Sequence, residues 1–182
     1  MSTNIQAPLV WIDCEFTSLD FHHNKMVEIA CVITDAELNI LGEPVSCIIG
    51  YTPEELDPLL SEWSREHFEE SLLLEKIYQS TTTLQEAEEC ILNYLGQFTQ
   101  SGESPLCGNS VSQDRRVLYT NMPKLDTFLH YRIIDVSTLK ELVNRWRPEI
   151  AEYVNKKQAH RALDDIYESI EELRVYKNHL FK

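Results

Sequence analysis

The chain has 182 residues, 43% of them apolar and 25% charged, which is typical of one globular domain with a sizeable core. Its formal net charge is −14, from 16 Lys and Arg against 30 Asp and Glu. This charge argues against a long protein groove that binds the phosphate backbone of a nucleic acid. Such grooves draw their affinity from many cationic side chains. No stretch approaches the roughly 18 apolar residues of a membrane span.

The first residues, "MSTNIQAPLV", contain neither a basic segment nor an apolar run of the kind that directs secretion. We therefore expect a cytoplasmic protein, and whether a targeting segment once preceded this start stays open. The cysteines are five in number and form no C-x-x-C pair, which disfavours a disulfide framework or a zinc site. Most are expected to be small buried side chains in a reducing compartment.

Three strands are predicted first, over residues 8–16, 26–34 and 38–50, and the short turns between them favour an antiparallel meander. Two helical patterns follow, over residues 60–78 and 83–98. Thr83 and Glu86 form a capping-box pattern at the start of the second helix.

The second half alternates between strands and helices. A short strand in 104–110 leads to a helix that carries Asp114, for which Ser110 and Gln113 suggest a capping box. A strand at 131–136, a helix at 137–146 and a last helix from about 161 to 181 complete the chain. This order predicts a single α/β domain, residues 1–182, built around a mixed sheet.

Two acids interrupt the apolar first strand. Asp13 and Glu15 are two residues apart, so their side chains share one face of a strand. Ionised carboxylates beside a core are costly unless they are paired or bind a metal. An edge strand with a solvated face is one explanation; a pair of ligands for a hard cation is the other, and the flanking Trp11 and Phe16 favour it.

Further acids occur on two of the predicted helices. On the last helix, Asp165 lies at the flank of the apolar face, whereas Asp164 points to solvent. His160 precedes this helix and is either a solvated loop residue or a general base beside a metal. Asp114 has Arg115 and Arg116 as neighbours, and taken alone a plain salt bridge explains it slightly better than a metal site.

Four segments, "WIDCEFTSLD", "GNSVSQDRR", "HYRIIDVSTLKEL" and "AHRALDDIYES", together resemble the marker segments of oligoribonucleases. These are 3′→5′ exoribonucleases of the superfamily that uses four acids and a histidine. The resemblance implies an RNase H-like mixed five-stranded sheet flanked by helices, two Mg²⁺ or Mn²⁺ ions, and a homodimer. It implies hydrolysis of short RNA oligomers, down to dinucleotides, to 5′-mononucleotides.

The resemblance also implies residue roles. The metal-binding acids are matched by Asp13, Glu15, Asp114 and Asp165, and the general base by His160. Leu19 matches a leucine that wedges between two bases, and Trp63 an aromatic that stacks on a base. The residues that close over the 5′ phosphate are matched by Ser110, Tyr131 and Arg132, with the tyrosine coming from the partner subunit.

Without the resemblance, Leu19, Trp63 and Tyr131 would be interpreted as a turn hydrophobe, a core residue and a strand-edge aromatic. One departure concerns the phosphate cap. Phe68 stands where the family usually has a histidine, and His67 precedes it. Either His67 takes over that contact or the cap is weakened, which puts a strict dinucleotide preference in doubt.

Two other functions compete with this interpretation. A nuclease that trims longer RNA or DNA 3′ ends would need a more basic surface than this chain offers. A non-catalytic binding module would be expected to have lost at least one of the acids or the histidine, and all five are present.

Overall fold

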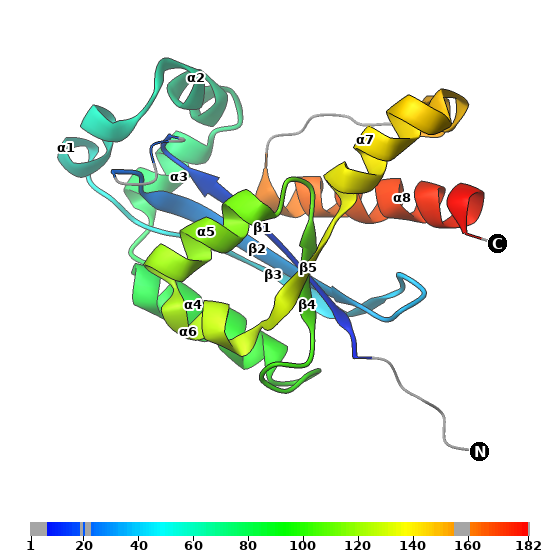
Figure 1. Cartoon of the computed structure of the whole chain (residues 1–182). Coiled ribbons are helices and arrows are strands. Elements are labelled where there is room, and N and C mark those ends of the chain that lie inside the picture. The colour runs from blue at the N-terminus through cyan, green and yellow to red at the C-terminus, as the bar shows by residue number, and fades with distance from the viewer. Residues whose placement is uncertain (1–6, 19, 21–22, 155–160, 182) are drawn as a thin grey trace.

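The computed structural model describes residues 7–18, 20, 23–154 and 161–181. Five strands form one sheet in the order β3-β2-β1-β4-β5 (Figure 1). The first three make the predicted antiparallel meander, and β4 and β5 add to it in parallel, so the expected mixed five-stranded sheet is confirmed. The strands are β1 (Leu9–Phe16), β2 (Met26–Thr34), β3 (Ile40–Ile48), β4 (Pro105–Gly108) and β5 (His130–Asp135).

Helices cover both faces of the sheet (Figure 1). Side chains of β1 alternate between the two layers: Val10 and Ile12 pack in one buried cluster, and Trp11 packs in the other. The first cluster takes in α4 (Leu84–Leu95), α5 (Ser112–Asn121) and α6 (Pro123–Phe128). The second takes in α7 (Val136–Trp146), the 3₁₀ helix η2 (Pro148–Tyr153) and α8 (Ala162–Leu180).

A third buried cluster lies apart from these two, where β2 meets a group of short helices. The helices are α1 (Pro53–Leu56), η1 (Asp57–Leu59), α2 (Glu62–Glu70) and α3 (Leu73–Gln79). The prediction of one helix over 60–78 is therefore wrong. Leu72 adopts a left-handed conformation with φ of 56°, which separates α2 from α3. The break lets Phe68 and Leu73 enter the same cluster.

The two predicted capping boxes differ in outcome. Thr83 and Glu86 form the capping box of α4, as predicted. The box at Ser110 is wrong, because Val111 is the N-cap of α5 and Ser110 has a positive φ of 50°. Its hydroxyl instead lies 3.2 Å from Ser137 Oγ.

The cysteines behave largely as expected. Cys14, Cys31 and Cys107 are buried, Cys47 is half-buried and Cys90 is exposed, and all are free thiols. Among the described residues, no helix combines the length and apolar character needed to cross a membrane.

Candidate active site

Asp13 and Glu15 project from the same face of β1, because side chains on a strand alternate between its two faces. Trp11 shares that face and packs in the cluster of α7 and α8, so the two acids also point toward α8. Both are half-buried, and the edge-strand explanation is wrong because β1 is the central strand of the sheet. The strand thus keeps its apolar contacts and presents two carboxylates on one side.

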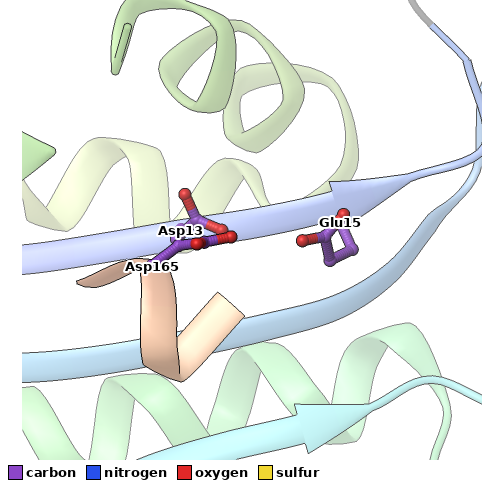
Figure 2. Close-up of side chains that lie close together, drawn as sticks. All are labelled: Asp13, Glu15 and Asp165. Carbon is purple, nitrogen blue, oxygen red and sulfur yellow. The ribbon is translucent and has the colours of Figure 1, made fainter. Parts of the chain in front are cut away.

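Asp165 reaches the same place from the first turn of α8. One carboxylate oxygen from each of Asp13, Glu15 and Asp165 lies within 4.8 Å of the other two. Figure 2 shows the Asp165 carboxylate beside Asp13, with Glu15 further along β1. Asp164 is exposed, as the helical geometry predicts, while Ile166 anchors the same turn in the core.

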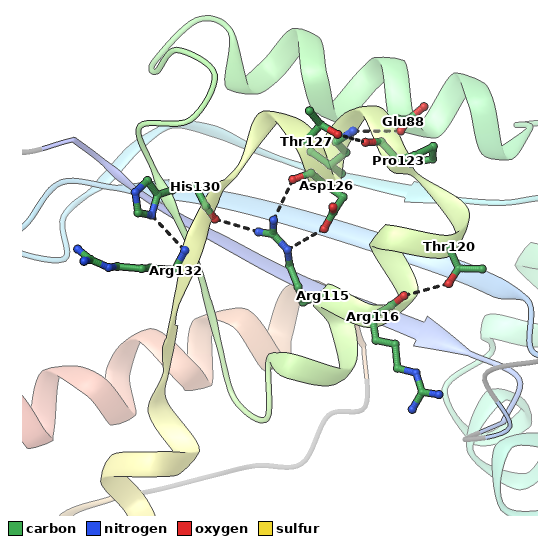
Figure 3. A network of polar contacts seen from close by, with 10 residues as sticks. Glu88, Arg115, Arg116, Thr120, Pro123, Asp126, Thr127, His130 and Arg132 are labelled. Atoms are coloured by element: carbon green, nitrogen blue, oxygen red, sulfur yellow. Dashed lines mark hydrogen bonds and ion pairs between the residues drawn. The ribbon is translucent and has the colours of Figure 1, made fainter.

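Asp114 comes from α5, on the opposite face of the sheet. It is 6% exposed, and its Oδ1 accepts a hydrogen bond from the main-chain N–H of Cys14 at 3.0 Å. Its neighbour Arg115 pairs instead with Asp126, with 2.7 Å between Nε and Oδ1. The Arg115 guanidinium also donates to the main-chain carbonyls of Asp126 and His130 (Figure 3). The salt-bridge explanation of Asp114 through Arg115 is therefore wrong.

Burial and neighbouring negative charges raise the pKa values of Asp13, Glu15 and Asp114. Burial, then the negative charge of Asp165, raises the pKa of Glu15 to about 8. Burial raises the pKa of Asp114 to about 7, against the lowering effect of the Cys14 hydrogen bond. Burial, followed by the charges of Asp114 and Glu15, raises the pKa of Asp13 well above its usual value.

A cation would relieve this repulsion. Among the residues that the structure describes, the donors in this cluster are carboxylate oxygens with no thiolate, which suits a hard divalent ion. The residues present therefore fit a divalent metal, which agrees with the expectation from the sequence.

A cavity of about 480 Å³ opens beside Glu15. Trp63, from α2, forms part of its wall and is 59% exposed, so the interpretation of this tryptophan as a core residue is wrong. The lining consists of Cys14, Glu15, Phe16, Ser18, Ser61, Trp63 and Ser64. An apolar cavity with an exposed aromatic ring adjoins the acids and has a size suited to a small ligand.

His67 and Phe68 point in different directions from α2. The His67 ring stacks on Trp63 with 3.8 Å between ring centroids, and its Nδ1 lies 3.1 Å from the Trp63 carbonyl. Phe68 is 2% exposed and packs in the third cluster. Of the two residues, His67 is therefore the one that stands beside the cavity wall.

Ser110 and Tyr131 lie at opposite ends of a parallel strand pair. In the β4–β5 pairing, Pro105 is opposite His130 and Gly108 is opposite Asp135, so Ser110 follows the far end from Tyr131. The Ser110 N–H donates to Asp135 Oδ1 at 3.0 Å. Tyr131 is 74% exposed on the edge strand β5, as both of its interpretations expect.

Arg132 accompanies Tyr131, with its guanidinium carbon 5.3 Å from the centre of that ring. Within one chain, the structure does not bring these two residues together with Ser110. Two other predicted residues, Leu19 and His160, lie outside the described residues, so their roles stay predictions.

Sequence reasoning missed a buried ion pair beside the acids. Glu28 is the only charged residue of β2 and lies opposite Glu15 in the β1–β2 register. Its carboxylate pairs with Arg161, the N-cap residue of α8. The isolated charge within an apolar strand was the signal that could have identified Glu28.

The sequence profile of the RNase T-type exonuclease family matches residues 10–173. An oligoribonuclease of Marinobacter nauticus is 48% identical over 175 residues, which are 96% of each chain. A human protein named "Oligoribonuclease, mitochondrial" is 50% identical over 175 residues, covering 96% of this chain and 73% of the human one.

Solved structures with this fold include exonuclease I of E. coli in complex with single-stranded DNA. The TM-score is 0.67 at 17% identity, and the match covers 96% of this chain. The chain spans 41% of the length of that nuclease, and the likeness establishes the RNase H-like fold alone.

Proposed function

This chain belongs to the oligoribonuclease family, and from that premise we propose that it hydrolyses short RNA oligomers, down to dinucleotides, from the 3′ end to 5′-mononucleotides. The observation that carries the proposal is the cluster of Asp13, Glu15 and Asp165, from β1 and α8, beside a cavity with an exposed tryptophan. Asp114 of α5 adjoins this cluster through its hydrogen bond to the main chain between Asp13 and Glu15. The strongly acidic composition fits a short substrate, which needs no long basic groove.

In this proposal, Asp13, Glu15, Asp114 and Asp165 hold two divalent ions, Mg²⁺ or Mn²⁺. Such ions, when bound, stabilise negative charge on a scissile phosphate and lower the pKa of an attacking water. The carboxylates hold no proton in that state, because the bound charge outweighs their mutual repulsion. His160 accepts the proton of the water, a role for which an imidazole of intrinsic pKa ~6.5 is suited near neutral pH.

The cavity binds the bases. Trp63 stacks on one base, and Leu19 wedges between the two bases of a dinucleotide. Such stacking typically contributes ~1–3 kcal/mol per base and tolerates any sequence. Ser110 and His67 contact the 5′ phosphate, and Arg132 reaches it together with Tyr131, which it accompanies on β5. His67 is supported in this role by its contact with Trp63.

We further propose that the active form is a homodimer in the cytoplasm. Tyr131 is exposed on an edge strand, far along β5 from the Ser110 loop of its own chain, which supports its reaching the site of a second subunit. The five free thiols are in keeping with a reducing compartment.

The test uses 5′-labelled RNAs from two nucleotides to a few tens, incubated with Mn²⁺ or Mg²⁺ and then with a chelator added. Rapid, chelator-sensitive loss of the shortest RNAs, with long RNA nearly untouched, is the expected result. Efficient shortening of long RNA would assign the chain to general 3′-end trimming and would mean that the cap is weakened at Phe68. An absence of hydrolysis at every length would overturn the proposal.

A second experiment separates the base from the metal site. His160→Ala is expected to retain Mn²⁺ binding and folding while losing most of the rate. Near-normal turnover in this variant would contradict the role of His160.

A further inference from the structure

Glu28 is a carboxylate enclosed in the sheet. It is 1% exposed, and every residue of β2 is buried. Ala30 and Val32, which share its face of the strand, pack in the cluster of α7 and α8, so Glu28 faces α8 like Asp13 and Glu15. A charge at such a position requires a partner, because a buried charge that has lost its hydration is strongly destabilising when it is unpaired.

That partner is Arg161, which holds the carboxylate in a two-pronged contact. Its Nε donates to Glu28 Oε2 at 3.0 Å, and a terminal nitrogen donates to Oε1 at 2.7 Å. Ser46 of β3 adds a hydroxyl donor to Oε1 at 3.2 Å. A planar guanidinium bound through two parallel hydrogen bonds fixes direction as well as distance.

Arg161 also begins the helix that carries Asp165. The main-chain N–H of Asp165 donates to the Arg161 carbonyl at 3.0 Å, which is the first helical hydrogen bond of that turn. The connection therefore runs from β2, through Glu28 and Arg161, into the backbone of Asp165. Since β2 is hydrogen-bonded to β1 in a register that places Glu28 opposite Glu15, the connection begins beside one acid of the site and ends at another, Asp165.

We propose that the Glu28–Arg161 pair is a positioning device for the metal site: it sets the first turn of α8 against β1 and so fixes how closely Asp165 approaches Asp13 and Glu15. This inference rests on the proposed function, because it assigns to the four acids a divalent ion. Neither member of the pair is placed among the metal ligands.

The charge of the pair has a second consequence. Arg161 is close enough to Glu15 to lower its pKa, although burial and the neighbouring acids outweigh this effect. Glu28 neutralises the guanidinium and holds both of the donors that face it. Removing Glu28 leaves a cation beside the acids, where it competes with a divalent ion for the same carboxylates.

The experiment measures Mn²⁺ binding directly, by electron paramagnetic resonance of free Mn²⁺, without RNA. The variants are Arg161→Gln, Glu28→Gln and Arg161→Lys. Arg174→Gln is the matched control, since Arg174 also lies on α8, donates to the Leu38 carbonyl at 2.9 Å, and anchors the helix away from the acids. The Mn²⁺ concentration that gives half the maximal hydrolysis rate is recorded in parallel.

Arg161→Gln and Glu28→Gln are each expected to weaken Mn²⁺ binding by about tenfold, the lower end of the effect of residues that orient metal ligands. Arg161→Lys keeps the positive charge but loses the two-pronged guanidinium contact. Its Mn²⁺ affinity is expected to lie between those of these variants and the wild type. Arg174→Gln is expected to bind Mn²⁺ as the wild type does, whatever its melting temperature.

Unchanged Mn²⁺ affinity in Arg161→Gln and Glu28→Gln, with only the melting temperature lowered, would overturn the inference and leave the pair a purely structural contact. If a single variant fails to fold, the double variant Glu28→Gln/Arg161→Gln, which buries no lone charge, gives the same comparison. A wild-type chain that binds no Mn²⁺ and hydrolyses no RNA would instead overturn the proposed function itself.

Discussion

The main-chain N–H of Cys14 donates to Asp114 Oδ1 at 3.0 Å, across 100 residues of sequence. Cys14 lies between Asp13 and Glu15, so the bond ties α5 to the segment of β1 that carries both acids. Asp114 therefore has two separable properties, an acceptor oxygen that holds β1 and a negative charge that faces the other carboxylates.

Asp114→Asn and Asp114→Ala distinguish these properties. The asparagine keeps an oxygen for the Cys14 N–H, so we expect near-normal folding and a rate reduced by about 100-fold or more through loss of a ligand charge. The alanine strands a buried N–H and is expected to cost an additional ~1–3 kcal/mol of unfolding free energy. Urea denaturation and hydrolysis of a labelled dinucleotide measure the two effects. Asp114→Asn with an unaltered rate would contradict the assignment of Asp114 to the metal site.

The raised pKa values of the acids predict how stability changes with pH. In the folded chain the pKa of Glu15 is about 8 and that of Asp114 about 7, against ordinary values of 4.5 and 3.8. At pH values between the ordinary and the raised pKa, each carboxyl holds more proton in the folded state than in the unfolded state. The free energy of unfolding of the metal-free chain therefore falls as pH rises from about 5 to 8. Melting temperatures in a chelator, compared at pH 5 and pH 8, measure this fall.

Divalent ions are expected to reverse the trend. Metal binding displaces protons from these carboxylates, so the gain in melting temperature from Mn²⁺ should grow from pH 5 to pH 8. Asp13→Asn/Glu15→Gln is the control and should show both a smaller decline without metal and little gain with it. A gain from Mn²⁺ that is equal at both pH values would rule out titration of these acids as its source.

Trp63 is predicted to bind a base rather than support the core. Trp63→Ala should weaken binding of a dinucleotide by about 1–3 kcal/mol, seen as a higher KM, with Mn²⁺ binding unchanged. Trp146→Ala is a matched control, because Trp146 is also an exposed tryptophan near a helix end and does not line the cavity. Equal KM values for the two variants would mean that Trp63 does not touch the substrate.

Phe68 offers a test of the phosphate cap. Because Phe68 is buried in the third cluster, Phe68→His should place an imidazole in an apolar environment and cost about 1–3 kcal/mol without improving dinucleotide turnover. His67→Ala, by contrast, should lower affinity for a 5′-phosphorylated dinucleotide and leave stability nearly unchanged. A stable Phe68→His protein with faster turnover would show that position 68 reaches the substrate.

Local periodicity was sufficient for much of this architecture. The two-residue repeat placed Asp13 and Glu15 on one face, and the helical repeat separated Asp165 from the exposed Asp164. The antiparallel meander followed from short turns between apolar runs. These features depend on neighbouring residues, so the sequence pattern contains them.

Local periodicity does not predict contacts between side chains that are far apart in the sequence. Glu28 and Arg161 are 133 residues apart. Arg115 pairs with Asp126 and not with its neighbour Asp114, because α5 packs against α6. The break at Leu72 lies in a stretch without glycine or proline, the residues that usually indicate the end of a helix in a sequence. The two short helices on either side of it place Phe68 and Leu73 in the same buried cluster.

The third cluster is smaller than the two that hold the sheet between its helical layers, and Tyr51 packs against both it and the first cluster. The short helices around the third cluster form a smaller unit, and the two larger clusters form the larger ones. The wall of the cavity that bears Trp63 belongs to the smaller unit, while Asp165 and Asp114 are carried by helices of the larger ones. A sub-global opening that frees α2 and α3 would leave the sheet and its acids intact. Warming should therefore erode substrate affinity before it unfolds the domain, and the amide protons of α2 should exchange ahead of those of α4 and α8.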